Sequence, residues 1–161
     1  MAKQSAGLLV YRRRQGAVEV FLVHPGGPFW AKKDFGAWSI PKGEFDDDEE
    51  CLAAARREFA EETGFAIDGT FVTLAPRLQP SRKTIHAWAI EGDVDETRLK
   101  SNEFEMEWPP RSGKRQRFAE VDRGAWFTIE EAKLRINPGQ IPFLDELRKL
   151  LIDNKTKQPN S

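Results

Sequence analysis

The amino-acid sequence predicts an α/β fold in a single domain. Short apolar runs of strand-like composition recur along the first two thirds of the chain, and a helical pattern over residues 48–63 interrupts them. A second amphipathic helical pattern, residues 139–152, lies near the end. The 161 residues correspond to about one domain and can bury a core without disulfide support. We therefore expect one domain over residues 1–153 and a frayed tail over residues 154–161.

The strand predictions rest on composition and on alternation. Four segments have the apolar, β-branched and aromatic composition of buried strands: residues 5–11, 18–24, 71–78 and 84–90. The polar residues 12–16 predict a hairpin-like turn between the first two segments, and residues 79–83 predict a turn between the last two. Within the fourth segment, Ile85, Ala87 and Ala89 share one face, because successive side chains of a strand point to opposite sides.

A glycine- and proline-rich break at residues 25–28 opens a loop that extends to Gly36. The loop carries three aromatic and two lysine side chains: Phe29, Trp30, Phe35, Lys32 and Lys33. A loop of this composition is more often functional than one of small polar residues, although aromatic side chains also anchor long loops. Residues 38–41 then form a short extended piece, since Pro41 disfavours helix at Ile40.

The C-terminal half shows less regular patterns. Residues 102–113 mix aromatics, acids and prolines, and they form either an edge strand that leads into a loop or a loop throughout. Short strands are predicted at residues 117–121 and 125–127, and Thr128 is predicted to cap a short helix. The final helix turns four leucines toward the core: Leu144, Leu147, Leu150 and Leu151.

The composition argues against several classes of protein. A formal net charge of −1 provides no global field to attract nucleic acid or an anionic membrane. No apolar run approaches the roughly 20 residues of a membrane span. The single cysteine, Cys51, excludes an internal disulfide and is predicted to be a small core residue. The N-terminal basic residues follow the first apolar run instead of preceding it, which is the wrong order for a signal peptide. We therefore expect a cytoplasmic protein.

The most informative segment is the helix predicted over residues 48–63. Asp47, with Glu50 three residues later, fits a capping box, and Gly64 stands where a left-handed glycine is expected to end the helix. On a helical wheel at ~100° per residue, three glutamates share one face and three apolar residues form a separate stripe. The glutamates are Glu58, Glu61 and Glu62, and the apolar residues are Leu52, Ala55 and Phe59.

Three carboxylates on one helix face repel each other, by roughly 0.2–0.5 kcal/mol per pair. Arg57 offsets part of this repulsion if it reaches Glu61, and a divalent cation would offset more. Mg²⁺ prefers oxygen ligands, and the turn before the helix offers the carbonyls of Lys42 and Gly43. The alternative interpretation is a solvated acidic face. The adjoining apolar stripe, and the absence of a lysine four residues after Glu58 or Glu61, favour the metal site.

Residues 43–65 read GEFDDDEECLAAARREFAEETGF. Gly43, then Glu49 after five residues, then residues 57–65 after seven more, match the Nudix box at every fixed position. Phe59 and Phe65 occupy its two bulky apolar positions. The sequence is therefore similar to Nudix hydrolases, and the flanking WSIPKGE and the order of the strands also fit. This resemblance implies an α/β/α sandwich with a mixed central sheet and the catalytic helix packed on it.

The resemblance also implies a reaction. Nudix hydrolases use Mg²⁺, or Mn²⁺ in its place, to cleave a phosphoanhydride bond in a nucleoside diphosphate linked to another moiety. Glu58 and Glu62 would then be the main metal ligands, and Glu61 a further ligand or a base. The backbone carbonyl of Lys42 would complete the ligand set. Three neighbouring residues would orient these groups: Arg57, Glu49 and Gly43.

Members of the family often use one more glutamate outside the box. We favour Glu120 for this role, because it stands six residues before Trp126. Similar proteins that act on dinucleoside polyphosphates or on capped RNA ends place a glutamate at this position. Three other candidates lie nearby and rank lower: Glu103, Glu105 and Glu107.

The substrate stays open between an NTP and a dinucleoside polyphosphate such as diadenosine tetraphosphate. The residues before the box resemble those of diadenosine polyphosphate hydrolases, and Lys42 is expected to contact phosphates. Phe29, Trp30, Trp38 or Trp88 would stack a base, with core packing as the alternative role of each ring. Two other functions are considered: an RNA 5′-end pyrophosphohydrolase, and a catalytically silent nucleotide- or protein-binding module. The oligomeric state is open between monomer and homodimer.

Overall fold

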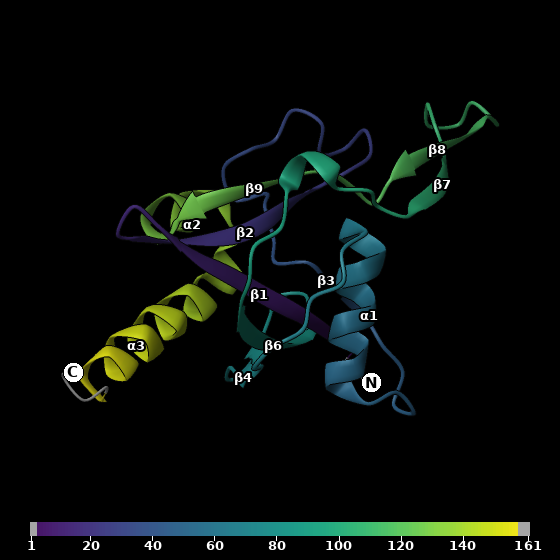
Figure 1. Ribbon diagram of the computed structural model, residues 1–161. Coiled ribbons are helices and arrows are strands. Elements are labelled where there is room, and N and C mark those ends of the chain that lie inside the picture. The colour runs from purple at the N-terminus through teal and green to yellow at the C-terminus, as the bar shows by residue number, and fades with distance from the viewer. Residues whose placement is uncertain (1–2, 158–161) are drawn as a thin grey trace.

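The computed structural model describes residues 3–157 and shows a mixed β-sheet with helices on both faces (Figure 1). The strands of this sheet are β1 (Gln4–Arg14), β2 (Ala17–Pro25), β3 (Lys42–Glu44), β4 (Val72–Thr73), β5 (Arg77–Leu78), β6 (Thr84–Glu91) and β9 (Val121–Thr128). The helices are α1 (Cys51–Thr63), α2 (Ile129–Arg135) and α3 (Ile141–Lys157), with short 3₁₀ turns at Glu96–Arg98 and Pro138–Gln140. This architecture confirms the predicted α/β/α sandwich.

The strand order β4–β6–β1–β2–β9 places β1 at the centre of the sheet, with β3 paired to β1 and β5 paired to β6. β1 runs parallel to β6 and antiparallel to β2 and β3, which makes the sheet mixed. Because β3 leads into the turn before α1, the central strand fixes the entry to this helix. The predicted metal-binding segment therefore starts from the middle of the fold.

Each face of the sheet carries its own apolar core. On the α1 side, Phe59 packs with Leu8 and Phe21. On the side of α2 and α3, Leu9 packs with Phe143. Adjacent residues of β1 thus point into different cores, as expected for a central strand buried on both faces. The alternation predicted for β6 is confirmed, since three of its residues join the second core: Ile85, Ala87 and Ala89.

The N-terminal hairpin is longer than predicted. Its turn consists of Gln15 and Gly16, where the sequence predicted residues 12–16. Both turn residues have positive φ angles, 51° and 78°, as in a tight two-residue hairpin turn. Charged side chains extend the strand pairing, because the Nε of Arg12 donates to Glu19 across the hairpin at 2.8 Å.

Residues 71–78 do not form the single strand that was predicted. They contain two separate two-residue strands, β4 and β5, which both pair with β6. Pro76 lies between them and lacks the N–H that a continuous ladder needs. The N–H of Ala75 donates instead to the carboxylate of Glu146 in α3, at 2.9 Å.

Helix α1 begins three residues later than predicted, at Cys51 instead of Asp48. The carboxylate of Glu50 accepts hydrogen bonds from two backbone N–H groups of the first turn, at 3.1 and 2.7 Å. Glu50 therefore caps the helix, and the predicted cap at Asp47 is wrong. The predicted end is confirmed, because Gly64 has a φ of 79° and its N–H closes the last turn.

The segment before β9 forms a two-stranded ribbon outside the main sheet. β7 (Glu103–Glu107) pairs antiparallel with β8 (Arg115–Ala119), and the ribbon projects from the body near one end of α1 (Figure 1). Residues 102–113 thus contain a strand followed by a turn. The strand predicted at residues 117–121 is divided between β8 and β9, and Glu120 lies at the division.

The C-terminal helices follow the prediction closely. The Oγ of Thr128 accepts from the N–H of Glu131 at 3.3 Å and caps α2. α3 begins at Ile141, and its inward leucines are Leu144, Leu147 and Leu151, with Leu150 beside them. Residues 154–157 of the predicted tail continue the helix, and residues 158–161 lie outside the described residues. Within residues 3–157, the helices lack the length and apolar character needed to cross a membrane.

Candidate active site

Glu58 of α1 lies directly against Gly43 of β3. The glutamate is only 8% exposed. A Cβ built on Gly43 would lie 1.9 Å from Oε2 of Glu58, so any side chain at this position would displace the carboxylate. The glycine that begins the motif is therefore required by the close approach of helix and strand.

Glu62, one turn further along α1, contacts the preceding residue of β3. The backbone N–H of Lys42 donates to Oε1 of Glu62 at 3.2 Å. Lys42 is itself held opposite Gly7 of β1. A Cβ at Gly7 would lie 2.6 Å from both the Cβ of Lys42 and the carbonyl oxygen of Pro41. β1, β3 and α1 are thus packed too closely to shift independently.

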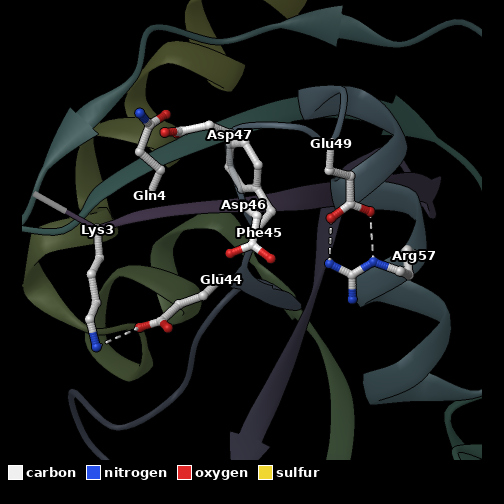
Figure 2. A pocket seen from close by; sticks show the side chains of 8 residues that line it. All are labelled: Lys3, Gln4, Glu44, Phe45, Asp46, Asp47, Glu49 and Arg57. Carbon is white, nitrogen blue, oxygen red and sulfur yellow. Dashed lines mark hydrogen bonds and ion pairs between the residues drawn. The ribbon is translucent and has the colours of Figure 1, made fainter.

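Arg57 binds the carboxylates from the outer side of α1. Its Nε and Nη2 donate to the two oxygens of Glu49 at 2.7 and 2.9 Å (Figure 2). Its Nη1 donates to Glu58 at 2.7 Å and to Glu61 at 3.1 Å. The contact with Glu61 is the one that the helical spacing predicted. The guanidinium also holds the pKa of Glu49 below its usual range, because a bidentate ion pair favours the carboxylate form.

The carboxylates that face β3 resist ionisation. Burial raises the pKa of Glu62 to about 8, against the lowering effect of Lys42, and the nearby carboxylates of Glu58 and Glu120 raise it further. Burial also raises the pKa of Glu58, against the lowering effect of Arg57. A cation among these groups would relieve both the desolvation and the mutual repulsion.

Glu120 reaches the same region from the foot of the ribbon. Its N–H donates to the carbonyl of Asn102, whose own N–H donates to the carbonyl of Glu61 in the last turn of α1, both at 2.8 Å. The carbonyl of Glu120 accepts from the N–H of Gly26 at 2.9 Å. Burial raises the pKa of Glu120, and the charge of Glu61 adds to this effect. Backbone contacts thus connect Glu120 to the end of α1.

The other three glutamates considered outside the box make contacts within the ribbon. Glu105 accepts from Arg115 of β8 at 2.7 Å, and Glu103 lies 4.0 Å from a second arginine of that strand. The carboxylate of Glu107 accepts from the N–H of Arg111 at 2.7 Å. These contacts bind all three side chains to the ribbon itself.

The carboxylate oxygens of α1 suit a hard divalent cation, although they are not arranged as a preformed metal site. Within residues 3–157, no three acidic, histidine or cysteine side chains lie closely enough to hold a metal ion. Arg57 occupies one oxygen of Glu58 as well as the oxygen of Glu61 that the helical spacing predicted. The fit rests on the chemistry of Glu58 and Glu62 beside β3, because carboxylate oxygens are ligands that Mg²⁺ prefers. Because burial raises the pKa of Glu62 to about 8, a cation that binds there near neutral pH would displace a proton from this carboxyl group.

Two hollows lie on either side of the β3 region. One, of about 310 Å³, lies beside the Glu49–Arg57 pair and the acidic turn before α1 (Figure 2). The other, of about 320 Å³, opens beside Lys42. Polar residues from distant segments line it: Ser5, Gln79, Ser81, Lys83, Asn137 and Gln140. The sequence alone does not reveal this cavity, because only the tertiary fold brings its walls together.

Gln140 has a positioning role that the sequence did not indicate. It is 2% exposed. Its Oε1 accepts from the N–H of Ile40 at 3.0 Å, and its Nε2 donates to the Oγ of Ser39 at 2.9 Å. These bonds hold the segment that leads to Lys42. No local pattern signals a contact between residues 100 positions apart.

The aromatic residues predicted to stack a base differ in exposure. Trp38 is 4% exposed, and its Nε1 donates to Asp34 at 2.7 Å. It belongs to the apolar core, so its predicted role as a stacking surface is wrong. Phe29 and Trp30 are 61% and 40% exposed in the loop before β3. Phe29 packs edge-on against Trp108 of the ribbon turn, with ring centroids 5.4 Å apart.

The comparison with protein families defines the class of this chain. The family model for the NUDIX domain matches residues 1–147. The chain therefore belongs to the NUDIX domain family, whose members typically hydrolyse phosphoanhydrides. No curated protein matched the sequence.

Solved structures share this fold at low sequence identity. A C. elegans Ap4A hydrolase in a binary complex is 21% identical, with a TM-score of 0.64 over 94% of this chain and 98% of that chain. The NUDIX domain of Shewanella oneidensis NrtR, complexed with ADP ribose, is 14% identical, with a TM-score of 0.63 over 94% and 89%. RenU, a Nudix hydrolase from M. smegmatis, is 21% identical, with a TM-score of 0.53 over 93% and 86%. These similarities establish the fold alone.

Proposed function

We propose that this protein is a Mg²⁺-dependent pyrophosphohydrolase of nucleoside diphosphates linked to another moiety, either an NTP or a dinucleoside polyphosphate. The observation that supports this most directly is the grouping of Glu58, Glu62 and Glu120 around β3 and the end of α1. Burial raises the pKa of all three carboxylates. Carboxylates that desolvation makes harder to ionise are suited to binding a divalent cation, which would supply the charge neutralisation on which phosphoryl transfer mainly depends.

Each residue of the site has a distinct proposed role. Glu58 and Glu62 hold the metal together with the backbone carbonyl of Lys42, and Glu61 is a further ligand or a base. When bound, Mg²⁺ supplies charge neutralisation at the phosphate oxygens. Glu120 accepts a proton from the attacking water, a task for which a carboxylate with a raised pKa is suited.

The surfaces around β3 are proposed to bind the rest of the substrate. The side chain of Lys42 provides a positive charge next to the carboxylates, and the adjoining polar cavity has room for part of a nucleotide. The exposed rings of Phe29 and Trp30 offer faces on which a base can stack. The structural similarity to an Ap4A hydrolase makes dinucleoside polyphosphates a class to test beside NTPs.

The function can be tested by incubating the purified protein with a panel of NTPs, dinucleoside polyphosphates and 5′-triphosphorylated RNA, with Mg²⁺ or Mn²⁺. Mass spectrometry identifies the products, and ¹⁸O-labelled water shows which phosphorus is attacked. We expect metal-dependent hydrolysis of at least one small nucleotide and weaker activity on RNA. A protein that binds nucleotides under these conditions but never cleaves them would contradict the proposal.

Two glutamine variants test the roles of the carboxylates. Glu62→Gln should lower kcat/KM at least about 100-fold by weakening metal binding. Glu120→Gln should lower kcat by about 100-fold or more, the usual contribution of a general base. Glu103→Gln, on the ribbon, is the matched control and should leave turnover unchanged. Normal hydrolysis by Glu62→Gln would overturn the metal site, and normal turnover by Glu120→Gln at every pH would overturn the choice of base.

A further inference from the structure

His24 is a fully buried histidine that the proposed chemistry does not use. It lies near the end of β2 and is 0% exposed. Its Nδ1 is 2.9 Å from Oδ1 of Asp122, and its Nε2 is 2.5 Å from the carbonyl oxygen of Lys33. The ring also packs edge-on against Trp38, with centroids 5.2 Å apart. Each polar atom of the side chain therefore has a partner.

Both partners of the ring accept hydrogen bonds and donate none. A backbone carbonyl carries no proton, and the carboxylate of Asp122 lies 3.5 Å from the guanidinium of Arg123. A neutral imidazole donates from one ring nitrogen only. The lone pair of its other, unprotonated nitrogen would then face an oxygen atom. An imidazolium donates from both nitrogens. The geometry of the two contacts therefore matches an imidazolium, which can donate to both oxygens.

The two bonds of His24 connect parts of the molecule that flank the candidate site. Asp122 stands at the start of β9, two residues after Glu120. Lys33 belongs to the loop of residues 26–36, which presents the exposed rings of Phe29 and Trp30. The end of that loop has its own attachment, because Asp34 pairs with Arg135 of α2. His24 thus provides the buried attachment for the middle of the loop.

We propose that His24, as an imidazolium, is a positioning residue that holds the loop of residues 26–36 where its aromatic side chains meet the nucleotide. The effect on substrate rests on the proposed function, whereas the effect on the loop does not. Loss of the charge removes one of the two bonds and frees the Lys33 carbonyl. The charged groups around the ring come from the loop, β9 and α2: Lys33, Asp34, Asp122, Arg123 and Arg135.

The charge of His24 can be observed directly by NMR. The chain has two histidines, so ¹⁵N-histidine labelling gives two sets of imidazole signals, and His24→Gln assigns them. At pH 7 we expect protons on both nitrogens of His24. An unprotonated nitrogen at His24 would overturn the proposal.

Trypsin reports on the loop, because it cleaves after Lys32 and Lys33, which are both exposed. A glutamine side chain can donate to only one of the two oxygens, so His24→Gln should accelerate cleavage about tenfold or more. His86→Gln, at the half-buried second histidine of β6, is the matched control and should be cleaved at the wild-type rate. Unchanged cleavage of His24→Gln would overturn the proposal.

A second variant keeps the proposal testable if His24→Gln fails to fold. Asp122→Asn places an amide donor opposite Nδ1, so a neutral ring can accept there and still donate from Nε2 to Lys33. We expect an unprotonated Nδ1, a protonated Nε2 and cleavage near the wild-type rate. Rapid cleavage of this variant, or protons on both nitrogens, would contradict the assigned contacts.

Kinetics test the consequence for the substrate. In His24→Gln, KM for the nucleotide should rise about tenfold while kcat stays within about twofold, because the carboxylates of α1 do not touch His24. A fall in kcat with unchanged KM would overturn the positioning role. If the wild-type protein hydrolyses no nucleotide, the proposed function fails, and NMR and proteolysis still decide the role of His24.

Discussion

At the scale of single residues, Gly43 determines where the carboxylate of Glu58 can lie. Gly43→Ala would place a methyl group 1.9 Å from that carboxylate. The flexible end of Glu58 can move away, so we expect the free energy of unfolding to change by less than about 1 kcal/mol. Turnover should fall at least about tenfold, because the displaced carboxylate no longer reaches the metal. Steady-state kinetics and urea denaturation measure the two effects.

A shorter side chain provides the control for this variant. In Gly43→Ala/Glu58→Asp, the carboxylate retreats by one methylene and leaves room for the new methyl group. The loss of kcat/KM in the double variant, expressed as a free energy, should therefore be smaller than the sum of the losses in the two single variants. Strictly additive losses would show that Gly43 acts through something other than contact with Glu58.

Glu62 gives the metal-free protein a characteristic dependence on pH. Its pKa is about 8 in the folded protein and near 4.5 in the unfolded chain. The folded state therefore binds the proton more tightly, and this contribution to stability, complete below pH 4.5, is lost as the pH rises to about 8. In EDTA, the free energy of unfolding should fall between these values more steeply for wild type than for Glu62→Gln. Parallel curves for the two proteins would contradict the buried, protonated Glu62.

The residues of the candidate site were predictable to the extent that they are close in sequence. Helical spacing alone places Glu58, Glu61 and Glu62 on one face and brings Arg57 to Glu61, and the structure shows these contacts. Gln140 and His24 gave no signal, because their partners lie on other elements. The burial of Trp38 was equally invisible, since an aromatic residue after a glycine-rich loop fits either a core or a binding surface.

At the scale of elements, Gly64 ends α1 in a left-handed conformation with a φ of 79°. A Cβ there would also lie 2.9 Å from the carbonyl oxygen of Lys100. Gly64→Ala should therefore lower the free energy of unfolding by about 2 kcal/mol. Gly113 is a matched control, since its φ is 74° and no atom lies within 4 Å of an added Cβ. Equal losses for both alanine variants in urea denaturation would exclude a role for the Lys100 contact.

The elements were predicted best where local chemistry decides them. The Thr128 cap, the Gly64 end and the alternation of β6 depend on neighbouring residues, and the structure confirms all three. The start of α1 was wrong because two acidic residues compete for the same role, and only backbone geometry selects Glu50 over Asp47. For residues 102–113 the sequence did not decide between a strand and a loop. The strands of the ribbon pair with each other outside the sheet, and alternation along one segment does not reveal such a pairing.

At the scale of the whole molecule, metal binding should stabilise the fold. A ligand that binds only the folded state at 100 times its Kd contributes about 2.7 kcal/mol, which corresponds to a rise in Tm of roughly 5–10 °C for a chain of this size. Saturating Mg²⁺ should produce such a shift in differential scanning calorimetry, and Glu62→Gln should abolish most of it. A wild-type Tm that is insensitive to Mg²⁺ and Mn²⁺ would contradict a metal site on α1.

The topology of the whole molecule could be predicted only through resemblance. Composition and periodicity predicted strands, helices and one domain, but they did not order the strands. The parallel pairing of β1 with β6 joins segments some 80 positions apart, such as Gln4 with Thr84. Its stability comes from burial on both faces, which depends on the helices that arrive later in the chain.

The backbone contacts at the foot of the ribbon separate what must stay fixed from what is free to vary. Asn102 joins Glu61 to Glu120 through main-chain atoms alone, so these bonds do not depend on the side chain at position 102. The turn at residues 108–114 lies beyond them and can change in length or sequence without moving Glu120. Evolution could therefore remodel the turn of the ribbon toward new substrates while the hydrolytic groups stay in place. A peptide tag inserted in this turn should likewise be tolerated.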